Sequence, residues 1–192
     1  IIINLSKELY MGINILGLGS YVPEQKLTND DFTRFVETND EWIRTRTGIR
    51  ERRMAGWEPT WYMGLQAAKQ AVEKSGINPE DIGLVIDCSV TPDFLTPSMS
   101  SVIQGRIGAV NAAAFDLNAA CSGFVYALDT AERFLRTDDT LKYVLVVANE
   151  ALSRFVDFND RTTCILFGDG AAAAVLERSD KLFSSHIASD GS

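Results

Sequence analysis

The feature that most constrains the fold is the alternation of short, β-branched apolar runs with longer amphipathic stretches. The runs "GINILGLGSYVP", "IGLVIDCSV" and "YVLVVAN" have the length and composition of strands, whereas "TWYMGLQAAKQAVEKSG" repeats its apolar residues at helical spacing. This alternation is typical of an α/β protein. We therefore predict one mostly parallel sheet with helices on its faces, undivided by any linker or low-complexity segment.

Capping and turn residues predict where the elements begin and end. Thr38 lies three residues before Glu41, a capping-box spacing, and Gly48 and Gly76 follow helical patterns at the position that favours glycine. The other expected elements are a strand ending at Gly19, a short helix capped by Thr28 or Asn29, a helix from Ser98 to about Gly108, the buried strand "AAFDLN", a helix beginning near Cys121, and a final strand pair around "CILFGDGAAAAVLE".

Charge excludes some classes of function. Eighteen basic and 26 acidic residues give a net charge of −8, which argues against general attraction to nucleic acid. Three cysteines without paired spacing indicate reduced thiols in a cytoplasmic protein, and a single histidine, His186, cannot build a metal-ligand cluster. No apolar run approaches the roughly 20 residues of a membrane span. Because Met11 is a plausible start, residues 1–10 are interpreted as a possible non-native extension.

Cys121 stands in "NAACSGFVYAL", between the strand "AAFDLN" and the following helix. Unpaired N–H groups and the dipole at a helix N-terminus favour a thiolate, and a strand-to-helix junction is where α/β proteins bind ligands. The alternative is a small, buried, hydrophobic cysteine. That alternative is favoured for Cys88 and Cys164, which lie inside apolar strand patterns.

The stretch "DEWIRTRTGIRERR" concentrates arginines in an otherwise acidic chain. Trp42 and Arg46 are four residues apart and share a helix face, so an indole could stack on a purine while a guanidinium binds phosphate. The alternative is a solvated basic surface with Trp42 as a core anchor. "FGDGAAAAVLE" is interpreted as a tight turn around Asp169, and His186 as a structural residue at a strand end.

Five blocks in the same order resemble one family. They are "GSYVPEQKLTNDDF", "TNDEWIRTRTGIRERR", "AAFDLNAACSGFVYAL", "NDRTTCILFGDGAAAAVL" and "SSHIASDGS", and they are similar to 3-oxoacyl-(acyl-carrier-protein) synthase III. The resemblance implies a thiolase-like αβαβα fold, of which residues 11–192 would form the N-terminal half. It implies an acyltransferase that starts type II fatty-acid synthesis by condensing acyl-CoA with malonyl-acyl carrier protein, as a homodimer and without a cofactor.

The resemblance also implies roles for individual residues. Cys121 matches the cysteine that accepts the acyl group, and Thr96 lies where some relatives carry a residue that shortens the acyl pocket. The positions that match the CoA-binding residues are Trp42, Arg46, Thr47, Thr38 and Arg161. Arg50, Arg52 and Arg53 are interpreted as surface charge.

The family's catalytic histidine and asparagine lie in blocks resembling "HQAN" and "GNTS", and neither block occurs in this sequence. Two alternatives therefore stay open. One is a non-catalytic CoA-binding or assembly half of a split synthase. The other is a different acyltransferase of the superfamily, such as a secondary-metabolite or hydroxymethylglutaryl-type synthase.

Overall fold

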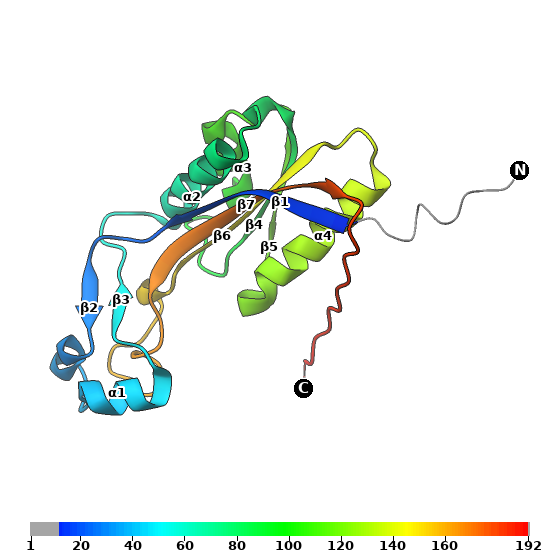
Figure 1. Ribbon diagram of the computed structural model, residues 1–192. Helices are drawn as coiled ribbons and strands as arrows, with labels where there is room; N and C mark the ends of the chain where they lie inside the picture. Colours follow the sequence, from blue (N-terminus) through cyan, green and yellow to red (C-terminus); the bar gives the residue numbers. More distant parts are fainter. Residues whose placement is uncertain (1–11, 192) are drawn as a thin grey trace, which may run out of the picture.

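The computed structural model describes residues 12–191, which form a mixed five-stranded sheet with helices on both faces (Figure 1). The predicted extension at residues 1–10 and the start at Met11 lie outside the described residues. The strand order is β1–β7–β6–β4–β5, formed by β1 (Gly12–Tyr21), β4 (Ile82–Cys88), β5 (Ala113–Leu117), β6 (Tyr143–Ala151) and β7 (Asp169–Ser179).

The prediction of a mostly parallel sheet is confirmed, with β7 as the exception. β4 pairs in parallel with β5 and β6, and β7 pairs antiparallel with both β6 and β1, so β1 runs in the same direction as the other three strands. Parallel neighbours need a crossover, which is usually a helix. Between β6 and β7 the chain forms only the one-turn 3-10 helix η5 (Leu152–Arg154) and turns, so β7 returns alongside β6 in the opposite direction.

One face of the sheet is covered by α2 (Thr60–Ser75) and α3 (Met99–Ile107). The core here joins small residues of α2 to β-branched residues of the strands. Gly17 and Gly19 of β1 allow this close packing, because a Cβ at either position would overlap a carbonyl oxygen of α2, that of Ala71 or Ala67. The helix therefore rests directly on the strand backbone.

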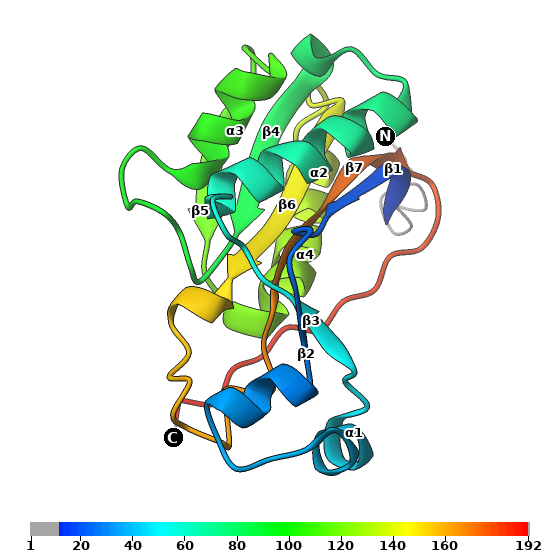
Figure 2. The ribbon, with the colours of Figure 1, turned by 90° about the vertical axis from the view of Figure 1, so that its left-hand side faces the viewer.

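The other face is covered by α4 (Gly123–Thr137), beside which the C-terminal segment 180–191 runs (Figure 2). Ala127, Ala131 and Leu135 of α4 are fully buried against the sheet, whereas Val125 and Phe134 are 51% and 43% exposed. The predicted buried strand "AAFDLN" is β5, but it lies at the sheet edge and is only partly buried.

A small lobe extends beyond the sheet (Figure 1). It contains β2 (Lys26–Thr28), β3 (Glu51–Arg53), the 3-10 helix η2 (Asp30–Arg34) and α1 (Asp40–Thr47). Its core includes Phe32, Ile43 and Cys164, so the segment after β6 belongs to the lobe as well. Cys164 is buried as predicted, but it lies in a turn rather than a strand.

The interpretation of Arg52 as surface charge is wrong. It is the middle residue of β3, 4% exposed, and its guanidinium lies over the Phe32 ring at 4.6 Å. Its Nε donates to the carbonyl of Ile165 at 2.8 Å, and another of its nitrogens donates to Asn29. Arg52 therefore joins β3 to η2 and to the turn before β7.

The predicted helix ends are confirmed at glycine. Gly48, Gly76 and Gly108 each adopt the left-handed conformation directly after a helix, with φ of 74°, 72° and 82°. α3 begins next to Ser98 as predicted, and the Ser98 hydroxyl caps it by accepting from the N–H of Ser101. Within residues 12–191, no helix combines the length and the apolar composition needed to cross a membrane.

Candidate active site

Three parallel strands end at the same edge of the sheet, and the candidate residues follow those ends. Cys121 comes after β5, Thr96 after β4, and Arg161 after β6. The carboxyl edge of parallel strands is where open α/β sheets bind their ligands. The topology therefore brings residues from three distant stretches of sequence to one side of the molecule (Figure 2).

Cys121 lies in the 3-10 turn η4 (Ala120–Ser122), between β5 and α4. Ala120 has a positive φ of 47°, and Gly123 begins α4 at a point where its Cβ would lie 3.1 Å from that of Cys88. Cys121 is exposed, whereas Cys88 and Cys164 are buried. The alternative of a buried, core-forming cysteine at position 121 is therefore wrong.

Trp42 has two guanidinium groups at its indole ring. That of Arg46, one turn along α1, lies 4.5 Å from the ring centroid, and that of Arg161 lies 3.9 Å from it. Arg161 comes from a turn organised by Asp160, whose carboxylate accepts from Thr162 and Thr163. These hydrogen bonds hold the pKa of Asp160 below its ordinary value, so the turn carries a fixed negative charge beside the arginine.

The two threonines near Trp42 differ from their predicted roles. Asn39, not Thr38, caps α1, because Asn39 is extended and its side chain accepts from the N–H of Trp42 at 2.8 Å. The Thr38 hydroxyl is buried without a hydrogen-bond partner among the described residues. The Thr47 hydroxyl donates to the Ile43 carbonyl at 2.8 Å and accepts from the Ile49 N–H, so it is engaged at the C-terminal end of α1.

Thr96 is exposed in the connection between β4 and α3. Among the contacts described for residues 12–191, none joins Cys121 to Thr96 or to the Trp42 group. The structure thus forms two separate parts of the predicted site. One is the cysteine turn, and the other is the indole with its two arginines.

A hollow of about 440 Å³ lies beside the cysteine turn, between β5, the start of α4 and the C-terminal segment. Tyr126 of α4 donates to the carbonyl of Ala188 at 3.0 Å and lies 2.9 Å from the Ser189 hydroxyl. His186, in the same segment, lies in an exposed irregular stretch rather than at a strand end. Tyr126 was not predicted as part of the site, because helical periodicity indicates the face on which a residue lies but not a hydrogen-bond partner 62 residues away.

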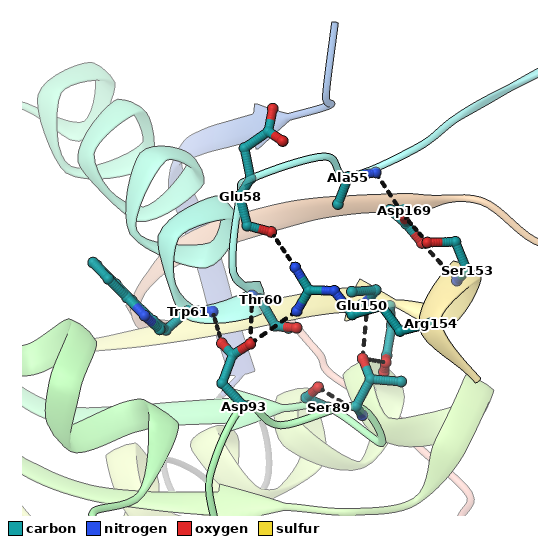
Figure 3. A network of polar contacts seen from close by, with 12 residues as sticks. Ala55, Glu58, Thr60, Trp61, Ser89, Asp93, Glu150, Ser153, Arg154 and Asp169 are labelled. Atoms are coloured by element: carbon teal, nitrogen blue, oxygen red, sulfur yellow. Dashed lines mark hydrogen bonds and ion pairs between the residues drawn. The ribbon is translucent and has the colours of Figure 1, made fainter. Parts of the chain in front are cut away.

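A polar network that the sequence did not reveal holds the ends of β4 and β6 together (Figure 3). Asp93 accepts from the N–H groups of Thr60 and Trp61, which start α2, and forms an ion pair of 3.1 Å with Arg154. Arg154 also donates to the backbone carbonyl of Glu58 at 2.7 Å. This network links the connection that follows β4, in which Thr96 lies, to η5, which follows β6.

The "FGDG" stretch is not the predicted tight turn between strands. Asp169 is the first residue of β7, it is buried, and its carboxylate accepts from the N–H of Ala55 and from both the N–H and the hydroxyl of Ser153 (Figure 3). Asp169 therefore ties the lobe to the end of β6. Among the described residues, no three His, Cys, Asp or Glu side chains are grouped to hold a metal.

The sheet, with α2 and α3 on one face and α4 on the other, has a thiolase-like fold. The family model described as 3-Oxoacyl-[acyl-carrier-protein (ACP)] synthase III matches residues 115–191. The chain is similar to proteins of this synthase III family over about half of their length.

Curated relatives show the same similarity. Beta-ketoacyl-[acyl-carrier-protein] synthase III of Clostridium acetobutylicum is 49% identical over 181 residues, which are 93% of this chain and 55% of the relative. The synthase III 1 of Bacillus cereus is 53% identical over 167 residues, 86% of this chain and 54% of the relative. The chain thus spans about half the length of the curated relatives it matches.

Solved structures show the same fold. The crystal structure of 3-oxoacyl-[acyl-carrier-protein] synthase III from Aquifex aeolicus VF5 superposes with a TM-score of 0.84 at 48% identity, over 88% of this chain and 54% of that one. The priming β-ketosynthase of the R1128 polyketide pathway gives a TM-score of 0.85 at 41% identity, over 89% and 51%. The Xanthomonas campestris OleA H285A structure gives a TM-score of 0.77 at 28% sequence identity, over 90% of this chain and 57% of that one.

Proposed function

We propose that Cys121 accepts an acyl group from an acyl-CoA thioester and that the protein then condenses this group with malonyl-acyl carrier protein. The observation that carries the proposal is the exposed thiol in the turn between β5 and α4, at the carboxyl edge of the sheet. The similarity to synthase III relatives supports the same reaction.

The first step forms one bond and breaks one. The sulfur of Cys121 attacks the thioester carbonyl, and CoA departs with the proton of the thiol as free CoA–SH. In the second step the malonyl group loses carbon dioxide, and the resulting carbanion attacks the acyl-cysteine and expels the thiolate of Cys121. The histidine and asparagine that the family uses for decarboxylation lie in blocks that these 192 residues do not contain.

Trp42, Arg46 and Arg161 supply the proposed site for the nucleotide end of CoA. Stacking on an indole suits an adenine, and guanidinium groups suit its phosphates. In this structure the Arg161 guanidinium lies 3.9 Å from the ring centroid of Trp42. An adenine that stacks on the ring face occupied by Arg161 must therefore displace that guanidinium, which can then cover the adenine's outer face. Thr38 and Thr47 stay predicted neighbours of this site.

Acyl transfer is tested by incubating the protein with acetyl-CoA and measuring intact mass and the labelled peptide. We expect one acyl group on Cys121, no label in Cys121→Ala, and normal labelling in the matched Cys88→Ala variant. Equal labelling of Cys121→Ala would contradict the proposal. CoA binding without any acyl transfer would instead favour the non-catalytic assembly half.

A second candidate is a priming synthase of secondary metabolism, which the similarity to the R1128 priming ketosynthase favours. Comparing condensation on the malonylated carrier protein of fatty-acid synthesis with that on a polyketide carrier protein separates the two functions. Comparing acetyl-CoA with C4 to C10 acyl-CoA primers tests Thr96, whose small side chain predicts acceptance of longer or branched primers. An acetyl-only enzyme would contradict that role. The homodimer and the cytoplasmic location stay predictions from the resemblance.

A further inference from the structure

A second hollow, of about 640 Å³, lies where β1 ends and the β3–α2 connection passes. It is lined by Tyr21, Glu24, Gln25, Gly56, Trp57, Glu58 and Tyr62. None of these residues belongs to the cysteine turn or to the Trp42 group. The hollow is therefore a feature that the proposed acyl transfer does not explain.

Aromatic rings form one wall of this hollow. Tyr62 is central, with the Trp57 ring at 4.8 Å and tilted by 56°, and the Tyr21 ring at 5.8 Å and nearly perpendicular. Trp57 is nevertheless 71% exposed. An indole held by a neighbouring ring on one side and open on the other presents a fixed π face to any molecule that enters.

A carboxylate lies behind the aromatic wall. Glu58 is only 5% exposed, and its oxygens accept from the Tyr21 hydroxyl at 3.3 Å and the Gly56 N–H at 2.9 Å. Both donors are neutral, and no ion pair to Glu58 or Glu24 is formed among residues 12–191. A buried carboxylate without a counter-charge carries a desolvation cost that a cation would offset.

The nearest arginine does not supply that counter-charge. Arg154 binds the backbone carbonyl of Glu58, whereas the carboxylate points away from the guanidinium (Figure 3). The effect of the negative charge is visible at Tyr21, whose pKa is raised by burial and then by the charges of Glu58 and Glu24. The hollow therefore combines π faces with a negative potential.

We propose that this hollow binds an organic cation, an alkylammonium group carried either by a small molecule or by a lysine side chain of a partner protein. Ammonium groups are attracted to aromatic faces and to carboxylates together, whereas an anion would be repelled by Glu24 and Glu58. A metal ion is a poorer fit, because no three acidic, histidine or cysteine side chains are grouped within the described part of the chain. The proposal goes beyond acyl transfer and does not rest on it.

The test compares choline with 3,3-dimethyl-1-butanol, which has the same shape but carries a carbon in place of the charged nitrogen. By isothermal titration calorimetry at constant ionic strength, we expect choline to bind roughly 5- to 30-fold more tightly. Trp57→Ala, Glu24→Gln and Glu58→Gln should each weaken choline binding several-fold. Phe155→Ala, which removes an exposed aromatic ring outside the hollow, should leave it unchanged.

Circular dichroism shows whether each variant folds. If Glu58→Gln does not fold, Trp57→Ala and Glu24→Gln still test the proposal. Equal binding of the neutral alcohol, or unchanged choline binding in both of those variants, overturns the proposal. Titration with Nα-acetyl-lysine amide identifies the source. Tighter binding of this compound assigns the site to a partner's lysine, tighter binding of choline assigns it to a small molecule, and binding of neither overturns the proposal. Acyl labelling of Cys121, measured separately, reports on the proposed function.

Discussion

Individual side chains in this protein take their properties from partners far away in the sequence. Trp42 and Arg46 share a face of α1 by spacing alone, but Arg161 reaches the same indole only because the segment after β6 packs into the lobe. The Asp87 carboxylate likewise depends on a distant residue, because it accepts a hydrogen bond of 2.6 Å from Asn149 on the neighbouring strand.

Removing the indole at position 42 should weaken CoA binding. Stacking on an aromatic side chain contributes about 1–3 kcal/mol per base, so Trp42→Ala should raise the Kd for CoA by roughly 5- to 150-fold. Trp57→Ala is the matched control and should leave the Kd unchanged. Isothermal titration calorimetry with CoA measures both, and equal losses in the two variants would contradict the assignment of Trp42.

Asp87 should make stability depend on pH. Burial, followed by the charge of Asp116, raises the pKa of Asp87 well above its ordinary value, and its Oδ1 has no hydrogen-bond partner within the described chain. The folded state therefore holds the proton more tightly than the unfolded state. The resulting stabilisation is complete below about pH 4 and is lost as the pH rises towards the folded-state pKa.

Replacing Asp87 by the neutral Asn removes this dependence. The free energy of unfolding of Asp87→Asn, relative to the parent protein, should increase as the pH is raised from about 4 to 7. Urea titrations at several pH values measure it, with the exposed Glu37→Gln as control. A difference that does not vary with pH would mean that Asp87 titrates alike in the folded and unfolded states.

Helices and strands differ in how well their ends and their packing can be predicted. Glycines next to a helix predict where it ends, whereas the packing of two elements depends on how closely their backbones approach. Glycines at 48, 76 and 108 were predictable as helix ends because each follows an amphipathic pattern. The contact between β1 and α2 was not predictable, because the sequence shows Gly17 and Gly19 within a strand but does not show which element packs against them.

Gly17→Ala should separate α2 from β1. The new methyl group would overlap the Ala71 carbonyl, and overpacking of this kind costs about 1–3 kcal/mol or more. Gly105→Ala is the matched control, because nothing lies within 4 Å of its Cβ position and alanine favours a helix over glycine by about 1 kcal/mol. Urea unfolding should show a loss for the first variant and no loss for the second.

The corrected cap of α1 gives another paired test. Asn39→Ala removes the acceptor for the Trp42 N–H and should cost about 1 kcal/mol. Thr38→Ala removes a buried hydroxyl without a hydrogen-bond partner among the described residues, so it should cost less. Chemical denaturation compares the two, and a larger loss in Thr38→Ala would restore the capping box predicted from sequence.

For the whole molecule, the two faces of the sheet are covered unequally. α2 and α3 cover one face, while α4 is the helix on the other and leaves Val125 and Phe134 exposed (Figure 1). β5 adds a free strand edge, which can pair with another chain. Apolar surface and an open edge together favour association.

The 192-residue chain expressed alone should therefore self-associate and bind an apolar dye such as ANS. Val125→Lys combined with Phe134→Lys should reduce dye fluorescence and shift the mass measured by light scattering towards the monomer. Phe155→Lys, which changes an exposed ring elsewhere, should do neither. A monomeric parent chain with no dye binding would show that this surface is well solvated.

Much of the architecture was predictable from sequence, because periodicity identified the strands and helices. The direction of β7 was not, since it depends on the lack of a helix between β6 and β7. The burial of Arg52 was not either, because its carbonyl partner lies 113 residues away. For the site, the place of Cys121 between a strand and a helix predicted its role, and the four-residue spacing predicted that Trp42 and Arg46 share a helix face. The ion pair between Asp93 and Arg154 was not predictable, because it forms only when the chain is folded.

The Asp93–Arg154 ion pair connects two loops with different proposed tasks. Asp93 lies three residues before Thr96, at the proposed acyl end of the substrate, and Arg154 lies seven before Arg161, at the proposed nucleotide end. The pair links the two loops through a single contact. We expect that breaking it would let the loops move relative to each other, so that ligands of more than one length could reach both.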